Sequence, residues 1–268
     1  MLRNMQELKS YAIGASNGEI GKIADIFFDD KSWVARYLVV DTGTWLTSRK
    51  VLISPYAVQR ADWEHKRLAV SLSREQVKNS PDIDTNLPVS RQHEAAPADY
   101  YRPPYYWGAD SYWGDGLYYP LDSDRTDAAE LHALAERARQ QSQDETHLRS
   151  CQTVMGYHVH ASDGDIGHVQ SMLVDEATWA IRYLVIDTSN WWIGNRVLIP
   201  PEWITNLNWT DSSVTVNLTR TTIRNSPRYE STADLNRSHE LELYSHYGRP
   251  NYWEREHARE TLPAELLE

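Results

Sequence analysis

The chain consists of two copies of one sequence, and this duplication constrains its fold more than any other feature. Matched positions recur at a constant spacing of 146 residues, as Gly18 and Gly164 do. From Tyr11 to Pro81, 26 of 71 positions are identical to their counterparts, and the alignment needs no gap. Solenoid units repeat every ~20 to 50 residues, so a spacing this long indicates duplication of a whole domain.

The duplication predicts three segments. We expect a first domain with its tail over residues 1–122, a helical connector over 123–146, and a second domain with its tail over 147–268. The connector is predicted to form a helix over 127–139, where leucine and alanine recur at helical spacing. A barrel of ~80 residues is marginally stable alone, so we expect the two copies to form an internal pseudo-dimer. Association into a further homo-oligomer stays open.

Composition narrows the class of partner and the compartment. Hydrophobic residues at 41% and charged residues at 24% are typical of a globular protein. The net charge of −11 argues against a nucleic-acid partner, because such proteins need a dense basic face. The sequence has no apolar run near ~18 residues, so we expect no membrane span. Its single cysteine, Cys151, excludes an intrachain disulfide, and we expect a cytoplasmic protein.

Each copy is predicted to be a series of short strands joined by tight turns. Asn17-Gly18 and Asp163-Gly164 favour type I′ hairpin turns with positive φ at both centres. Further strands are expected over 20–28, 33–41, 50–54, 61–63 and 67–72. Residues 73–81 favour a short helix with Ser73 as its N-cap. This many short strands predicts a small closed or nearly closed β-barrel in each copy.

Several motifs in each copy resemble a known domain family. The motifs are Gly18-x-x-Gly21, Arg36 to Gly43, Lys50 to Pro55 and Ser73 to Pro81. They resemble the PRC-barrel domain, which is shared by the photosynthetic reaction centre H subunit and the C-terminal domain of a ribosome maturation factor. The resemblance covers residues 11–81 and 157–227, although Ser189 replaces Gly43 in the second copy. It implies a mainly β chain with two tandem small barrels.

The resemblance implies a non-enzymatic interaction or scaffold protein, and it leaves the finer role open. Association with photosynthetic or electron-transfer complexes is implied by the H subunit, although its membrane-spanning helix is missing here. A second hypothesis is an RNA-processing or ribosome-maturation adaptor, which the acidity of the chain disfavours. A small-ligand carrier is a third, and a deep pocket lined by Trp45, Trp191 and the two His-Glu pairs would favour it.

Polar side chains with reactive potential have structural explanations in the sequence. The aspartates at strand ends can be considered as acid–base pairs, but such residues usually accept hydrogen bonds from their own turn backbone. These aspartates are Asp29, Asp41, Asp175 and Asp187. Arg36 is expected to point outward and pair with one of them. His93-Glu94 and His239-Glu240 lie in segments predicted to lack regular structure, without the converging ligands of a metal site. We expect no catalytic residue, no cofactor and no metal.

Aromatic residues are the remaining candidates for a partner surface. Residues 100–107 and 247–253 form proline-containing aromatic strips that we expect to be extended and packed on a barrel. Core and barrel-to-barrel packing is the default role of the repeated tryptophans, and a ligand or partner groove is the alternative. The candidate partner residues are Trp45, Trp191, Tyr101, Tyr106, Trp107, Tyr247, Tyr252 and Trp253.

Overall fold

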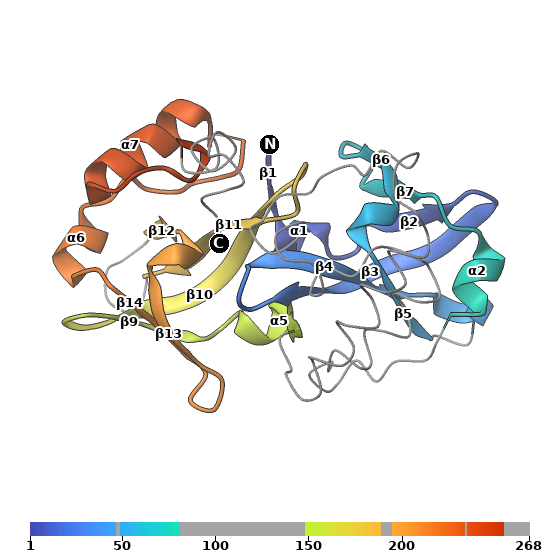
Figure 1. Cartoon of the computed structure of the whole chain (residues 1–268), viewed down its shortest axis with the longest axis horizontal. Helices are drawn as coiled ribbons and strands as arrows, with labels where there is room; N and C mark the ends of the chain where they lie inside the picture. The colour runs from blue at the N-terminus through green and yellow to red at the C-terminus, as the bar shows by residue number, and fades with distance from the viewer. Residues whose placement is uncertain (47–48, 81–147, 189–194, 234, 255–268) are drawn as a thin grey trace, which may run out of the picture. The chain divides into compact units, whose positions relative to one another are not determined.

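The computed structural model describes residues 1–46, 49–80, 148–188, 195–233 and 235–254 (Figure 1). They belong to two units: unit 1 comprises residues 1–156 and 171–184, and unit 2 comprises residues 157–170 and 185–268. The predicted connector helix over 127–139 lies outside the described residues.

The first repeat forms one sheet with the strand order β5-β4-β3-β2-β7-β6. Its strands are β2 (Ala12–Ala15), β3 (Gly18–Asp29), β4 (Val34–Asp41), β5 (Lys50–Ile53), β6 (Val58–Asp62) and β7 (Arg67–Val70). Neighbours pair antiparallel except β2 and β7, which are parallel. Every residue of β4 from Val34 to Val40 is buried, so this β-branched and aromatic strand lies in the core.

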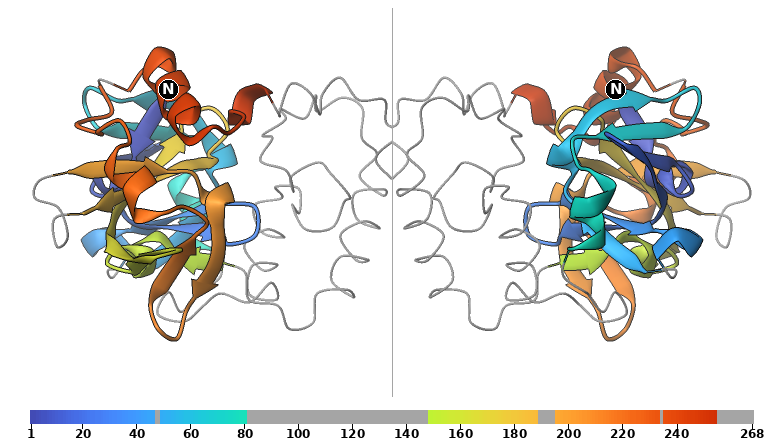
Figure 2. Two further views of the ribbon diagram at one scale, coloured as in Figure 1. Left: turned by 90° about the vertical axis from the view of Figure 1, so that its left-hand side faces the viewer. Right: turned by 90° about the vertical axis from the view of Figure 1, so that its right-hand side faces the viewer.

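The second repeat forms a sheet of the same order, β12-β11-β10-β9-β14-β13. Its strands are β9 (His158–Ala161), β10 (Gly164–Asp175), β11 (Ile181–Asp187), β12 (Arg196–Ile199), β13 (Ile204–Asn208) and β14 (Ser213–Val216). Figure 2 shows β13 and β14 in orange as an antiparallel hairpin. The prediction of a mainly β chain with two similar sheets is therefore confirmed for the described residues.

Each sheet gains a seventh strand that the sequence did not predict. β1 (Leu2–Asn4) pairs with the end of β10, and β8 (Leu148–Ser150) pairs with the end of β3. Short helices follow these strands, α1 (Met5–Leu8) after β1 and α5 (Cys151–Val154) after β8. All of these pairings lie within unit 1.

The described strands do not close into the expected barrel. Each strand order ends at two edges, β5 and β6 in the first sheet and β12 and β13 in the second. In each repeat the two edges are consecutive in the chain, joined by η2 (Pro55–Ala57) or η3 (Pro201–Trp203). Proline fixes φ and removes a donor, so the 3-10 turn redirects the chain away from the first ladder. The following strand then pairs on the other edge.

The hairpin turns differ from the predicted type. Gly18 has φ 143° and Gly164 has φ 136°, which confirms the positive φ at the glycines. Asn17 is not among the residues with positive φ, and Ala15 pairs with Gly18, so the turn centres are Ser16 and Asn17. The Asn17 side chain instead accepts a hydrogen bond from the Arg74 N–H at 2.9 Å. The type I′ prediction was wrong because this side chain is used at a neighbouring helix.

Short helices close each repeat as predicted. α2 (Arg74–Lys78), teal in the right-hand view of Figure 2, has a capping box formed by Ser73 and Gln76. α6 (Arg220–Arg224) begins after Thr219, whose hydroxyl accepts from a backbone N–H in the same way. Among the helices that the structure describes, none is long and apolar enough to span a membrane.

Candidate functional site

Trp45 is the candidate partner residue that the structure describes in the first repeat. It lies on η1 (Gly43–Leu46) and is half-buried. The indole Nε1–H donates to the backbone carbonyl of Ile20, and the Arg74 guanidinium carbon lies 4.3 Å from the ring centroid. A cation at this distance is attracted by the aromatic face. The ring is thus held from two sides and remains partly accessible.

The hairpin turn supports this arrangement through Asn17. Its Nδ2 donates to Glu75 Oε2 at 2.7 Å, and its Oδ1 accepts from the Arg74 backbone. The hydrogen bond from Asn17 is the main cause of a lowered pKa of the Glu75 carboxyl. We call Trp45, Arg74, Asn17 and Glu75 the Trp45 corner. Its side chains are held by a turn and a helix, which reduces the entropy that a partner would have to remove.

The second repeat keeps the bond between the turn side chain and the helix backbone. Asp163 Oδ1 accepts from the Arg220 backbone N–H at 2.7 Å. A Cβ on Gly164 would lie 3.3 Å from Arg220 Cδ, as one on Gly18 would lie 3.2 Å from Arg74 Cδ. Trp191, the counterpart of Trp45, lies outside the described residues.

The second aromatic strip packs inside unit 2 around Trp203. The Trp203 ring lies 4.7 Å from that of Tyr247 and 5.6 Å from that of Tyr244, measured between centroids. Tyr252 and Trp253 stack edge-on at 4.9 Å. Tyr247 and Tyr252 are each 9% exposed, whereas Trp253 is half-buried. The structure therefore brings the three predicted residues of this strip together in a packed cluster.

Tyr247 ends a helix, and Tyr252 and Trp253 lie in a further helical turn, so the prediction of an extended backbone was wrong for these residues. α7 (Arg237–Tyr247) includes His239 and Glu240, which were predicted to lack regular structure. The sequence did contain the signals: Asn236 accepts from the His239 N–H as N-cap, and Gly248 ends the helix at φ 62°. They were missed because the aromatic and proline content dominated the interpretation.

Glu240 is a buried carboxylate that fastens the strip. It is 5% exposed, lies 3.1 Å from Arg237 Nη1, and accepts from the Tyr252 hydroxyl at 3.2 Å. The Arg237 guanidinium carbon also lies 4.0 Å from the Trp253 ring centroid. A buried carboxylate with these partners is a structural clip.

Burial of Tyr247 predicts an alkaline loss of stability. Burial raises the pKa of Tyr247 from 10.0 to about 12, so the folded chain keeps this phenol protonated where the unfolded chain ionises it. The contribution is complete below pH 10 and is lost as the pH rises towards 12. Replacing Tyr247 by Phe should lessen the loss of unfolding free energy between pH 9 and 11 by about 1 kcal/mol. Urea unfolding at both pH values measures this, and equal losses in both proteins would contradict it.

Three of the four aspartates at strand ends bind their own turns, as predicted. Asp29 Oδ1 accepts from the Ser32 N–H at 2.8 Å, and Asp41 Oδ1 accepts from the Gly43 N–H at 2.8 Å. Asp175 accepts two such bonds in the second repeat. Arg36, in contrast, is 5% exposed, so its predicted outward position was wrong. Its guanidinium donates to the Ser32 hydroxyl at 3.0 Å, because the turn brings that oxygen under β4.

Cys151 is buried in unit 1 beside Met5. Burial raises the pKa of the thiol well above its usual range, so the thiol stays protonated near neutral pH. Its Sγ lies 3.7 Å from Met5 Sδ. This environment suits packing and disfavours nucleophilic chemistry.

Other candidates lie outside the described residues. They are His93, Glu94, Tyr101, Tyr106, Trp107 and Trp191.

The described part of the chain contains no cluster of three or more His, Cys, Asp or Glu side chains suited to a metal. A hollow of about 510 Å³ in unit 2 is lined by residues 225–228 and by Glu242, Ser245 and His246. None of the predicted aromatic residues lines it.

Comparison with known proteins identifies the domain of the first repeat. Residues 9–77 match the model of the PRC-barrel domain family, so this segment is a PRC-barrel domain. The match includes the Trp45 corner and all strands of the first sheet from β2 to β7. Comparison with curated proteins gave no match.

Proposed function

We propose that this chain is a non-enzymatic interaction or scaffold protein that uses its two repeats as an internal pseudo-dimer. The observation that carries the proposal is the PRC-barrel domain over residues 9–77. The PRC-barrel family consists of adaptor domains that share no catalytic residues, so the fold itself supplies no chemistry. A protein partner fits the acidic chain better than a nucleic acid does.

The chemistry of the candidate side chains supports the same proposal. Asp29 and Asp41 are committed to turn hydrogen bonds, and Cys151 is a buried thiol. Glu240 is bound by Arg237 and Tyr252. These groups serve the fold, which leaves binding as the function that the described residues favour.

The Trp45 corner is the surface that we assign to a protein partner. Tryptophan and arginine are enriched at the energetic centres of protein interfaces. Here a half-buried tryptophan and an arginine are stacked, and the turn and helix beneath them are fixed by Asn17. Tyr247 and Tyr252 are less suited to this role because both are buried within unit 2.

Charge reversal at the corner tests the proposal. Full-length tagged chain is crosslinked in native lysate, and copurifying proteins are identified by mass spectrometry for wild type and for Arg74→Glu. We expect Arg74→Glu to reduce recovery of the specific partner at least about tenfold, which corresponds to about 1.4 kcal/mol. Arg67→Glu is the matched control, since Arg67 is 57% exposed on the same repeat.

Equal recovery in all three samples would remove the corner from the interface. Absence of any specific partner of the wild-type chain, together with turnover of a small molecule, would contradict the scaffold proposal itself. A cytoplasmic location is part of the proposal, supported by a single cysteine that is a free thiol. Association with photosynthetic or electron-transfer complexes rests on family resemblance, and the identity of the captured partner decides it.

A further inference from the structure

The two seventh strands are exchanged reciprocally between the repeats. Leu2 pairs with Asp175 in β10, and Leu148 pairs with Asp29 in β3. Leu148 is the counterpart of Leu2, and Asp175 is the counterpart of Asp29, at the spacing of the repeat. The N-terminal strand of each repeat therefore pairs with the equivalent strand of the other repeat. We call residues 2–8 and 148–154 the arms. We call the region of unit 1 in which the arms pair with β10 and β3 and the two repeats meet the arm joint.

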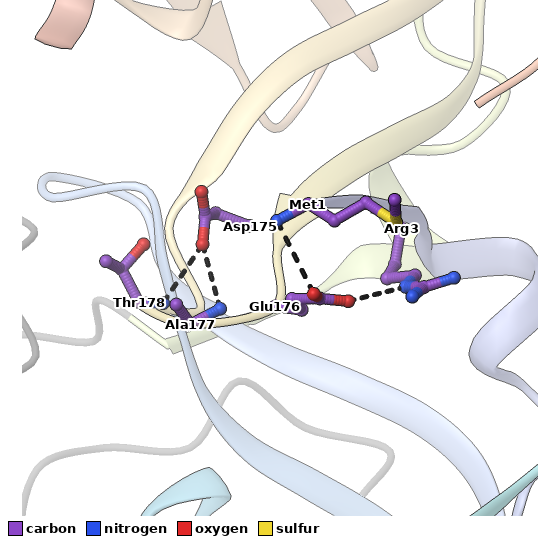
Figure 3. Close-up of polar contacts among 6 residues, drawn as sticks. All are labelled: Met1, Arg3, Asp175, Glu176, Ala177 and Thr178. Carbon is purple, nitrogen blue, oxygen red and sulfur yellow. Dashed lines mark hydrogen bonds and ion pairs between the residues drawn. The ribbon is translucent and has the colours of Figure 1, made fainter. Parts of the chain in front are cut away.

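Ion pairs repeat the same reciprocity. Arg3 Nε lies 2.8 Å from Glu176 Oε2, and Met1 binds the other oxygen of this carboxylate through its amino group at 3.5 Å (Figure 3). The equivalent pair, Arg149 Nε and Asp30 Oδ2, is 3.0 Å apart. The side chains of the second pair are 17% and 11% exposed, so water screens them less than surface ions.

At the centre of the arm joint, residues contact their own counterparts. Met5 touches Cys151 through sulfur, and Val34 forms a β-bridge with Ala180. Two symmetric backbone bonds flank the bridge, from the Ala35 N–H to the Trp179 carbonyl at 2.9 Å and from the Ile181 N–H to the Trp33 carbonyl at 2.7 Å. A residue that meets its own equivalent is the mark of an isologous contact.

The backbone is strained where these bonds form. Trp33 has φ 54° and Trp179 has φ 57°, in a region that bulky residues seldom occupy. In both repeats the same residue type takes this conformation and supplies the same carbonyl to the joint. Strain repeated in this way is typical of a site where the contact itself maintains the geometry.

We propose that the arm joint is a self-association surface, and that a second copy of this chain can occupy it by exchanging arms. An isologous surface is complementary to another copy of itself, so the edge that receives an arm from its own chain fits the same arm of a second chain in the same register. The proposal rests on the internal pseudo-dimer of the proposed function and extends it to association between chains.

Two full-length variants with opposite charges test this exchange. The acidic variant carries Arg3→Glu and Arg149→Glu, and the basic variant carries Asp30→Arg and Glu176→Arg. Alone, each variant places like charges at both ion pairs of its own joint. In an arm-exchanged dimer of the two, every acidic position faces a basic one, so all the ion pairs are restored.

We expect the two variants, refolded together, to form a dimer of twice the 31.0 kDa chain mass by light scattering, and neither alone to do so. Arg67→Glu mixed with Glu19→Arg is the control, because that exposed pair lies within the first repeat, outside the joint. A mixture that stays at the mass of the single chain would overturn the proposal. It would leave the Trp45 corner and the proposed function untouched, since the corner shares no residue with the arm joint.

A second experiment keeps the test independent of charge. One chain carries Asn4→Cys and Cys151→Ser, so its only thiol is on the arm, and the other carries Ser171→Cys and Cys151→Ser, so its only thiol is on the strand that receives this arm, where the Ser171 hydroxyl donates to Asn4 Oδ1. Refolding the two together under oxidising conditions should give a covalent heterodimer that reduction separates. Recovery of both chains as uncrosslinked monomers would overturn the exchange, whatever the charge variants do.

Discussion

Gly21→Ala should be among the most destabilising single changes in this chain, costing more than about 3 kcal/mol of unfolding free energy. A Cβ on Gly21 would lie 2.0 Å from the backbone oxygen of Asp41. Backbone on the neighbouring strand cannot rotate away as a side chain can, so β3 and β4 would have to separate at this point. Chemical unfolding of the full-length chain measures the effect.

The control is Gly14→Ala on the adjacent strand β2. The nearest atom to a Cβ there is the Leu68 oxygen at 4.0 Å, so its unfolding free energy should stay within about 1 kcal/mol of wild type. Gly167→Ala should reproduce the large effect, because a Cβ there would lie 1.9 Å from the Asp187 oxygen. A small effect at Gly21 would show that the two strands do not approach as closely as described.

Trp203→Ala should cost about 3 to 5 kcal/mol, because it leaves a large cavity beneath α7. Trp203 is 2% exposed and packs against Tyr244 and Tyr247, with the Arg249 guanidinium carbon 5.1 Å from its ring centroid. The loss should also expose the aromatic strip, so binding of a hydrophobic dye should rise with the loss of stability.

Tyr56→Ala is the control for that substitution. Tyr56 occupies the η turn of the first repeat and is 41% exposed, so its removal should change the unfolding free energy by less than about 0.5 kcal/mol. Similar stabilities for Trp203→Ala and wild type would mean that α7 and its strip are not held by Trp203.

Local patterns in the sequence predicted much of each repeat. The buried strand β4 was evident from its β-branched and aromatic run, and α2 from Ser73 and the proline that follows the helix. These features depend on residues near one another in the chain, where propensity and capping act directly.

Long-range pairing could not be predicted in the same way. β1 and β8 are three residues long, too short for a periodic signal, and their partners are far away in the sequence. Likewise, the open edges at β5 and β6 depend on how Pro55 redirects the chain. At the candidate site, Trp45 was identified by its repetition, whereas its stacking on Arg74 depends on tertiary contact.

The contact between the arms can be tested directly by a disulfide. Met5→Cys introduces a thiol opposite Cys151, where the wild-type sulfur atoms are 3.7 Å apart. If the arms of the two repeats meet as described, oxidation of the full-length variant should produce an intrachain disulfide, with no free thiol after denaturation and faster migration without reductant. Two free thiols per chain after the same treatment would contradict the reciprocal exchange of arms on which this account rests.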